Sequence, residues 1–179
     1  MSAQSFMQRE GIDFTEVYAP VSKHSTMRAL LALVVTEDLV LRQLDVITAF
    51  LNSDLVDIYM RQPPGYEQGG PNVVCHLQRA QYGLCQAPRA WHTKLKSMLE
   101  ELGFIESESD PGLFTRQLAD KYPTFVLAYI DDMLLVSANV MVVINKIVTA
   151  FAFKDKGEAA MFVGMEIDRD HNACTLKVT

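Results

Sequence analysis

Three segments of the chain repeat apolar side chains at helical spacing: residues 25–38, 88–102 and 140–153. The spacing predicts a helix in each, because apolar positions three and four residues apart share one helical face. Ser25 or Thr26 is the expected N-cap of the first helix. Pro88 at the start of the second and Gly103 just past its end are typical of helix boundaries.

Other segments are short, rich in β-branched and aromatic residues, and bounded by turn residues, which predicts strands. They are residues 41–47, 58–61, 73–77, 113–117, 125–130, 133–137, 161–167 and 173–178. The last two are expected to form a closing hairpin, and the Pro- and Gly-rich residues 62–72 a loop. The whole pattern predicts a mixed α+β fold without internal repeats.

Composition narrows the class of protein. With 179 residues and 49% apolar content, the chain can bury the core of one domain, or of a domain with a satellite. Three cysteines without C-x-x-C spacing argue against a disulfide framework or a zinc finger. The N-terminus lacks the apolar segment of a signal peptide, and no apolar run approaches the roughly 18 residues of a membrane span. We expect an intracellular protein that is not secreted and has no membrane partner.

The net charge of −6 hides one basic segment. Residues 68–99 contain no acidic side chain but four cations, a formal charge of +4: Arg79, Arg89, Lys94 and Lys96. In the second predicted helix, Arg89 and Lys96 are seven residues apart and share a face opposite the apolar stripe. The segment is either a track for a polyanion or an ordinary solvated face, and the sequence leaves both open.

The chemistry is concentrated in Tyr129-Ile-Asp131-Asp132, which lies between two apolar runs and so at the tip of a predicted hairpin. Two adjacent carboxylates repel each other, and a divalent cation would relieve the repulsion. The alternative is a solvated Asp-Asp turn.

A third carboxylate favours the metal. If residues 41–47 form a strand, Leu44 and Val46 point to one face and Asp45 to the other. Asp45 with the two tip carboxylates would be a ligand set for two Mg²⁺ ions, the arrangement used in phosphoryl displacement. The chemistry implied is nucleotidyl transfer.

A series of motifs then resembles the reverse transcriptase of copia-type long-terminal-repeat retrotransposons, an RNA-directed DNA polymerase. In order they are QREGIDF from Gln8, YAPV from Tyr18, LDVITAFLNSDL, IYMRQPPGY, YGLCQAPRAW, SDPGLF, AYIDDMLLV, and FKDKGE leading into MFVGMEI. They cover essentially all of residues 8–168.

The resemblance implies a right-hand polymerase palm, an antiparallel sheet with helices on one face, together with a partial fingers subdomain and no thumb. Residues 1–20 would be a truncated fingers remnant, 21–52 palm, 53–90 fingers, and 91–179 palm with the primer-grip hairpin.

It also implies roles for single residues. Asp45, Asp131 and Asp132 would be catalytic ligands of two Mg²⁺ ions, with Mn²⁺ as a substitute. The nucleotide-binding residues would be Phe50, Gln86, Tyr129, Lys154 and Lys156. Phe50 would exclude a 2′-hydroxyl, although a core role for it stays open, and one of the two lysines would act as a general acid. The nucleic-acid-binding residues would be Arg79, Arg89, Lys96, Phe162 and Gly164.

The two tip carboxylates are expected to differ. The family pattern makes Asp131 the principal ligand. Strand alternation agrees if Tyr129 shares its face while Ile130 and Asp132 lean the other way.

The chain also departs from the family pattern. The basic fingers strand that should precede Gln8 is replaced by Met1-Ser-Ala-Gln-Ser-Phe-Met, and neither thumb nor RNase H follows Thr179. Cys85 replaces a usual lysine, His92 a tyrosine and Ser53 a glycine, and residues 139–144 lack the usual charges. We therefore expect that the isolated chain does not extend a primer.

Two functions follow as alternatives. The first is a reverse transcriptase domain that acts on dNTPs and a primed RNA or DNA template. It would be fused to integrase and RNase H in a polyprotein and located in a cytoplasmic retrotransposon particle or the nucleus. The second is a non-catalytic, decayed palm-fold remnant that at most binds nucleic acid. Another palm-fold nucleotidyl transferase, such as a cyclase, fits the fingers motifs less well.

Overall fold

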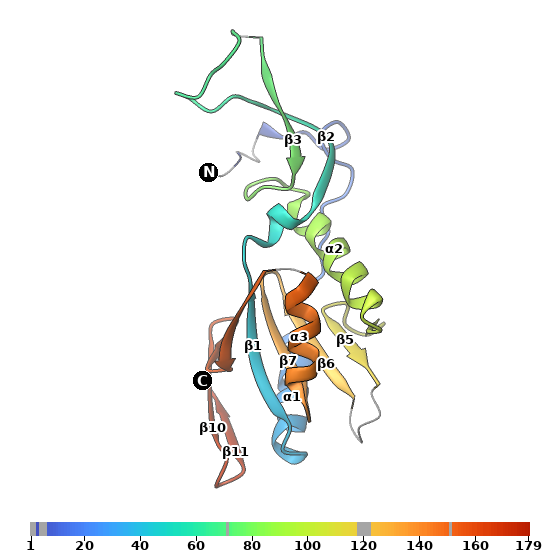
Figure 1. Ribbon diagram of the computed structural model, residues 1–179, viewed down its shortest axis with the longest axis vertical. Coiled ribbons are helices and arrows are strands. Elements are labelled where there is room, and N and C mark those ends of the chain that lie inside the picture. The colour runs from blue at the N-terminus through green and yellow to red at the C-terminus, as the bar shows by residue number, and fades with distance from the viewer. Residues whose placement is uncertain (1–2, 4–6, 71, 118–122, 151) are drawn as a thin grey trace. The chain divides into compact units, whose positions relative to one another are not determined.

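The computed structural model describes residues 3, 7–70, 72–117, 123–150 and 152–179 of the chain (Figure 1). The chain divides into two compact units, each built from two segments. The first unit comprises Met1–Ala19 and Ala49–Lys94, and the second comprises Pro20–Thr48 and Leu95–Thr179. The predicted mixture of helices and antiparallel strands is confirmed.

The second unit is built on a six-stranded antiparallel sheet with the order β4-β5-β6-β7-β1-β8. Its strands are β1 (Val40–Val46), β4 (Ile105–Glu106), β5 (Leu113–Arg116), β6 (Thr124–Tyr129), β7 (Asp132–Ser137) and β8 (Phe153–Glu158). β7 is buried at five consecutive positions, so both faces of the sheet centre are covered. Such a strand has an unbroken apolar sequence instead of an alternating one.

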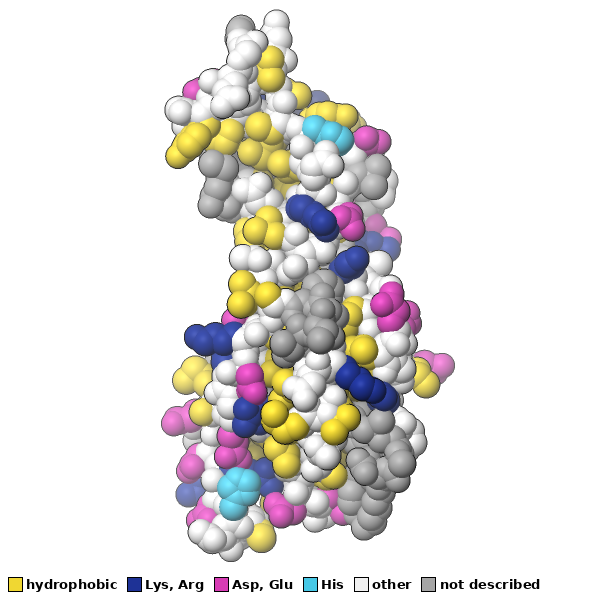
Figure 2. All heavy atoms as spheres, in the orientation of Figure 1, with side chains coloured by type: hydrophobic (Ala, Val, Ile, Leu, Met, Phe, Trp, Pro, Cys, Tyr) yellow, Lys and Arg dark blue, Asp and Glu magenta, His cyan; other side chains and the backbone are white. Residues whose placement is uncertain are grey.

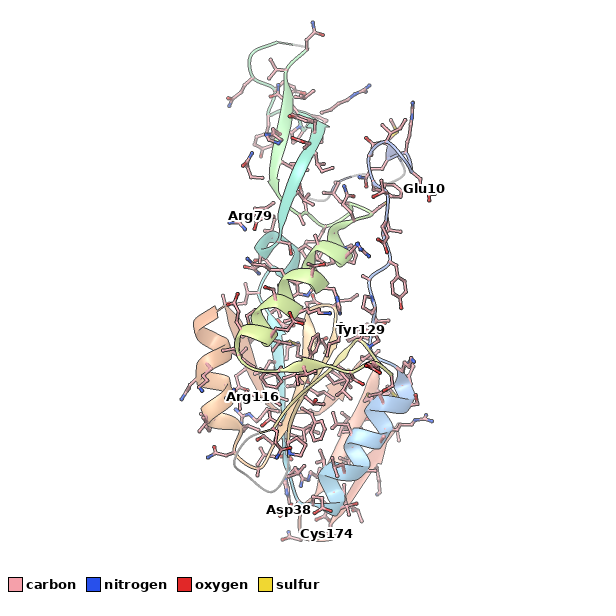
Figure 3. All side chains as sticks on the ribbon, turned by 90° about the vertical axis from the view of Figure 1, so that its right-hand side faces the viewer. Glu10, Asp38, Arg79, Arg116, Tyr129 and Cys174 are labelled. Carbon is pink, nitrogen blue, oxygen red and sulfur yellow. The ribbon has the colours of Figure 1, made fainter. Side chains whose placement is uncertain are left out.

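Two helices cover the two faces of this sheet. On one face α1 (His24–Thr36) buries Met27 and Leu31 in a cluster that includes Leu41 and Val136 of the sheet. On the other face lies α3 (Val140–Ala150) (Figure 3). The prediction of helices on one face only was therefore wrong. The helix predicted over 140–153 is confirmed from Val140 to Ala150, but Phe153, its predicted last residue, begins β8, and residue 151 lies outside the described residues.

Helix α1 begins without the predicted side-chain cap. Its N-cap is Lys23, which makes no capping hydrogen bond from its side chain. Instead, the buried carboxylate of Asp110 accepts hydrogen bonds from the backbone N–H of Lys23 and from the side chain of Thr26. The expectation of Ser25 or Thr26 as the cap was wrong, because an acidic side chain distant in sequence ties down this helix end.

Helix α2 (Ala87–Glu101) contains residues of both units. Four residues of its predicted apolar stripe are buried, Trp91, Leu95, Met98 and Leu99, while the fifth, Leu102, is half-buried and lies just beyond the helix end. Gly103 has a φ of 84°, and its N–H donates a hydrogen bond to the carbonyl of Glu100. The N–H of Phe104 donates one to the carbonyl of Leu99. These two bonds define a Schellman motif, so the predicted stop at Gly103 is confirmed.

The first unit contains the two-stranded antiparallel sheet of β2 (Asp54–Arg61) and β3 (Val74–Arg79). Its register pairs Ile58 with Leu77 and Met60 with Cys75, which confirms the predicted strand pair around the loop. The unit also holds η2 (Ala49–Asn52), a single 3₁₀ turn.

The C-terminal segment forms a separate three-stranded sheet of β9 (Met161–Phe162), β10 (Met165–Asp170) and β11 (Thr175–Val178). One strand over 161–167 was predicted, but a tight turn at Val163 and Gly164, both with positive φ, divides it in two. β8 was not predicted, because its charged sequence lacks apolar alternation. No helix in the described part of the chain is long and apolar enough to cross a membrane.

Candidate functional site

Asp45 and Asp132 are brought together by the sheet of the second unit. Asp45 is the sixth residue of β1 and Asp132 the first of β7, and the antiparallel register places them directly opposite each other. Side chains at opposed positions share one face of a sheet and lie close together. Both side chains are about one-third exposed, at 32% and 33%. The predicted strand carboxylate and one of the two hairpin carboxylates therefore form a pair.

The hairpin tip consists of Ile130 and Asp131. Ile130 has φ of 55°, a conformation that a β-branched side chain adopts only under strain. The carbonyl of Asp131 accepts a hydrogen bond from the backbone N–H of Val46 at 2.8 Å, which ties the tip to the end of β1. Strain of this kind is concentrated at functional sites.

This turn alters the predicted roles of the two tip carboxylates. Tyr129 is opposite Asp132 in the β6–β7 register, and Asp132 is opposite Asp45 in the next strand pair. Tyr129 therefore shares a face with Asp132, and the expectation that Asp132 leans to the other face was wrong. The physical reason is the left-handed residue in the turn, which interrupts simple strand alternation. Figure 3 shows Tyr129 at the end of β6 that leads to the tip.

A lysine ammonium bridges the two opposed carboxylates. Lys156 Nζ donates to Asp45 Oδ1 at 2.8 Å and to Asp132 Oδ1 at 3.0 Å. The hydrogen bond to Asp45 is the main cause of a raised pKa for Lys156, against the opposing effect of burial. The lysine therefore stays charged at neutral pH and neutralises one of the two negative charges.

A β-bulge carries Lys156 to this position. In the β1–β8 register Leu44 is opposite Asp155 and Gln43 opposite Gly157, so Lys156 is the extra residue between them. Bulges of this kind re-aim a side chain next to functional sites. Lys154, the other candidate for the general acid, is opposite Asp45 in the β1–β8 register. Of these two lysines, Lys156 is the one with described hydrogen bonds to the two carboxylates.

Neighbouring groups hold the bulge and the pair in place. The Arg42 guanidinium pairs with the carboxylate of Asp155, which also accepts the N–H of Gly157. Burial alone would raise the pKa of Asp155, but these two hydrogen bonds outweigh it and the pKa is lowered. The buried Gln43 donates from Nε2 to Asp132 Oδ1 at 3.2 Å. Gln43 was not singled out from the sequence, although a polar residue in an apolar strand was a signal.

The carboxylate oxygens of Asp45 and Asp132 are the candidate ligands for the expected magnesium ions. Carboxylate oxygens are suitable ligands for a hard divalent cation, and a cationic group already lies between these two. Over the described ranges of the chain, no group of three or more His, Cys, Asp or Glu side chains is arranged to hold a metal. Asp45 and Asp132 thus fit a cation as a pair, while the predicted three-carboxylate set is not assembled.

Phe50 and Gln86 belong to the first unit. Phe50 is buried, and its ring centroid lies 4.5 Å from that of Tyr82. The Gln86 side-chain oxygen Oε1 accepts a hydrogen bond from Gln8 Nε2 at 2.9 Å. The Gln86 side-chain nitrogen Nε2 donates one to the backbone carbonyl of Asp13 at 3.3 Å. Gln8, which also accepts the backbone N–H of Cys85, was noted only as the first residue of a motif.

The predicted nucleic-acid-binding cations all have acidic partners in the structure. Arg79 pairs with Asp54 at 2.6 Å, Arg89 with Glu16 at 2.7 Å, and Lys96 with Glu106. The hydrogen bond to Glu106 is the main cause of the raised pKa of Lys96. Figure 2 shows basic and acidic side chains interspersed on the visible face. Surface pairs of this kind are weak and can be exchanged for phosphate.

The two expected primer-grip residues lie in different environments. Phe162 is only 1% exposed and belongs to the core cluster under α1. Gly164 is exposed, in the turn between β9 and β10, with φ of 75°. Of these two residues, Gly164 alone offers a surface for a ligand.

Comparison with known proteins gives one consistent result. The family model described as "Reverse transcriptase (RNA-dependent DNA polymerase)" matches residues 1–179. The retrovirus-related Pol polyprotein from transposon RE1 of Arabidopsis thaliana is 40% identical over 172 residues, 93% of this chain and 12% of that protein. The Pol polyprotein from transposon TNT 1-94 of Nicotiana tabacum is 37% identical over 175 residues, 95% of this chain and 13% of that protein. The chain therefore spans about an eighth of these relatives. No solved structure matches it.

Proposed function

The chain belongs to the reverse transcriptase (RNA-dependent DNA polymerase) family, and we propose that it acts as the nucleotidyl-transfer domain of a copia-type retrotransposon polyprotein. The observation that carries this proposal is the pair of carboxylates, Asp45 and Asp132, opposed on neighbouring strands and bridged by an ammonium group. Phosphoryl transfer requires such an acidic site for cations.

In this proposal Asp45 and Asp132 hold a Mg²⁺ ion, for which Mn²⁺ can substitute. The second expected ion would need Asp131 to join them, because the three carboxylates are not grouped in the present arrangement. When bound, the ions would activate the primer 3′-hydroxyl and stabilise the leaving pyrophosphate. Asp45 and Asp132 contribute a fixed pair of anionic groups, because each is anchored in a strand. The tether between the carbonyl of Asp131 and Val46 holds the tip against β1. Gln43 keeps the Asp132 carboxylate oriented.

The two units support a palm and fingers division. The second unit, with its antiparallel sheet and carboxylate pair, would be the palm, and the first unit the fingers. The sequence motifs place the expected boundaries between palm and fingers after residues 20, 52 and 90. The chain passes from one compact unit to the other after residues 19, 48 and 94. This proximity supports the division.

The remaining motif residues would contact the substrates. Phe50, Gln86 and Tyr129 would contact the deoxynucleotide, as the family resemblance implies. Arg79, Arg89 and Lys96 would bind phosphate groups of the primer–template. Gly164, which has no side chain, would let the nucleic-acid backbone approach closely. The acidic partners of Arg79 and Arg89 are more than half exposed, at 66% and 56%, so phosphate can replace them, whereas Glu106, the partner of Lys96, is only 21% exposed.

The wider context of the domain is also part of the proposal. The relatives are Pol polyproteins of plant transposons. The substrates would be dNTPs and a primed RNA or DNA template, and the neighbouring segments would supply integrase and RNase H activities. The site of action would be a cytoplasmic retrotransposon particle or the nucleus.

The test is RNA-templated primer extension by the purified chain with Mg²⁺ or Mn²⁺, with nucleotide binding measured in parallel. Asp45→Asn is the matched variant, because it removes one negative charge with little change in shape. Because the isolated chain is not expected to extend a primer, the expected result is metal-dependent dNTP binding by the wild type that the variant loses, with any extension confined to the wild type. Nucleotide binding or extension that is equal in both would contradict the proposal.

One observation favours a second candidate function, a non-catalytic palm-fold remnant. Lys156 already neutralises one of the two negative charges of the carboxylate pair, and three-ligand groups are not found among the described residues. Such a protein would bind nucleic acid at most. Nucleic-acid binding that needs neither Asp45 nor a divalent ion, without primer extension, would assign the chain to this class.

A further inference from the structure

Lys156 and a divalent ion would compete for the same two oxygens. Its ammonium lies 2.8 Å from Asp45 Oδ1 and 3.0 Å from Asp132 Oδ1. A hard cation prefers carboxylate oxygens, and a divalent ion bound to the same two Oδ1 atoms would lie within contact distance of the ammonium. Two positive charges at one site would also repel each other.

We propose that Lys156 is an internal counter-ion of the metal site, and that its ammonium must leave Asp45 and Asp132 before a divalent ion can bind there. This inference rests on the proposed function, since it assumes that the carboxylate pair is the metal site. The lysine acts as a positioning residue: it holds the pair together without metal and lowers the apparent metal affinity.

The local structure supports a lysine that can move away. Lys156 is the bulged residue of β8, so its backbone is not paired in the β1–β8 register and its side chain is 35% exposed. The bulge itself is held by other contacts, the Arg42–Asp155 ion pair and the Asp155–Gly157 hydrogen bond. The side chain can therefore rotate into solvent while the strand stays in register.

The expected size of the effect is modest. An ion pair whose side chains are about one-third exposed contributes about 1 kcal/mol, so removing the competing ammonium should tighten metal binding by about fivefold. If only the loss of a positive charge mattered, metal affinity would change less, and removing a lysine that does not contact the carboxylates would have the same effect. Lys154 provides the matched control, because it is two residues away on β8 and is opposite Asp45 in the register.

The experiment is a Mn²⁺ titration of the full chain followed by electron paramagnetic resonance, which detects the free ion directly. Lys156→Met should bind Mn²⁺ about fivefold more tightly than the wild type, and Lys154→Met should change the affinity much less. An unchanged or weaker affinity in Lys156→Met, or equal tightening in both variants, would overturn the inference. Circular dichroism confirms that each variant is folded.

A second measurement covers the possibility that Lys156→Met fails to fold. The ¹⁵N resonance of the Lys156 ammonium in the wild type, assigned with Lys156→Arg, should change on addition of Mg²⁺, while that of Lys177 should not. A Lys156 signal that Mg²⁺ leaves unchanged, although the ion binds, would contradict displacement.

Asp45→Asn distinguishes failure of this inference from failure of the proposed function. If the wild type binds Mn²⁺ through a site that Asp45→Asn abolishes, but Lys156→Met has no effect, only the inference fails. If neither the wild type nor Lys156→Met binds Mn²⁺ at an Asp45-dependent site, the metal site of the proposed function fails with it.

Discussion

Asp132 is the acidic residue that the structure pairs with Asp45. The two are opposed in register, and both accept hydrogen bonds from one ammonium. We therefore predict that Asp132→Asn and Asp45→Asn reduce Mn²⁺ affinity by the same factor, because each removes half of one ligand pair. Calorimetric titration of both variants is the measurement. Family resemblance alone gives the leading role to Asp131, so a loss of affinity confined to Asp131→Asn would contradict this prediction.

Phe50 offers a test of substrate selectivity at the same scale. As a gate it would exclude a 2′-hydroxyl by steric clash, whereas its burial and its contact with Tyr82 also fit a core residue. If it is a gate, Phe50→Val should relax discrimination between dTTP and UTP, measured as the ratio of metal-dependent binding or incorporation. Tyr82→Leu is the control, because it disturbs the same ring contact. An unchanged ratio with a lower melting temperature in both variants would assign Phe50 to the core.

At the scale of elements, Asp110 connects the β4–β5 region to the start of α1. It accepts the backbone N–H groups of Lys23 and Gly112 and a hydrogen bond from Thr26. Gly112 cannot carry a side chain, because a Cβ there would lie 2.7 Å from the backbone of Ser22. The SDPGLF motif is thus explained here by packing at a helix end and not by chemistry.

A pH-dependent stability follows from this contact. Burial tends to raise the pKa of Asp110, but its three hydrogen bonds outweigh burial and lower it. A lowered carboxyl pKa stabilises the fold above the unfolded value of about 4, and the contribution is lost as pH falls below it. We predict that Asp110→Asn lowers the free energy of unfolding by about 1–3 kcal/mol at pH 7 and by less at pH 3. Urea denaturation at both pH values checks this, and an equal loss at both would contradict it.

Sequence patterns predicted the elements whose stability is local. The α2 helix has its stripe, its Pro88 and its Gly103 within one segment, and the β6 and β7 strands are uniformly apolar. What could not be predicted depends on contacts between distant residues. Nothing near His24 indicates a cap from Asp110, and nothing in FKDKGE indicates a strand whose extra residue brings Lys156 to Asp45. The carboxylates could be named from the sequence, but their pairing depended on the turn at Ile130.

At the scale of the whole molecule, the charge distribution predicts weak and salt-sensitive binding to nucleic acid. The net charge is −6, and the three candidate cations are each neutralised by an acidic partner. Glu16→Ala should strengthen primer–template binding because it frees Arg89, and Arg89→Ala should weaken it and lower the salt slope by about one. Fluorescence anisotropy at several salt concentrations is the measurement. The two variants should change the primer–template affinity in opposite directions. A change in the same direction would show that Arg89 does not contact the nucleic acid.

The central claim is that Asp45 and Asp132 form the divalent-metal site of a reverse transcriptase domain. Anomalous X-ray scattering from crystals of the chain soaked in Mn²⁺ tests it most directly, because it locates the ion without reference to activity. We predict an anomalous peak bonded to oxygens of both carboxylates, with Lys156 Nζ displaced from the position it holds between them. A peak elsewhere in the molecule, with Lys156 still bridging Asp45 and Asp132, would contradict it.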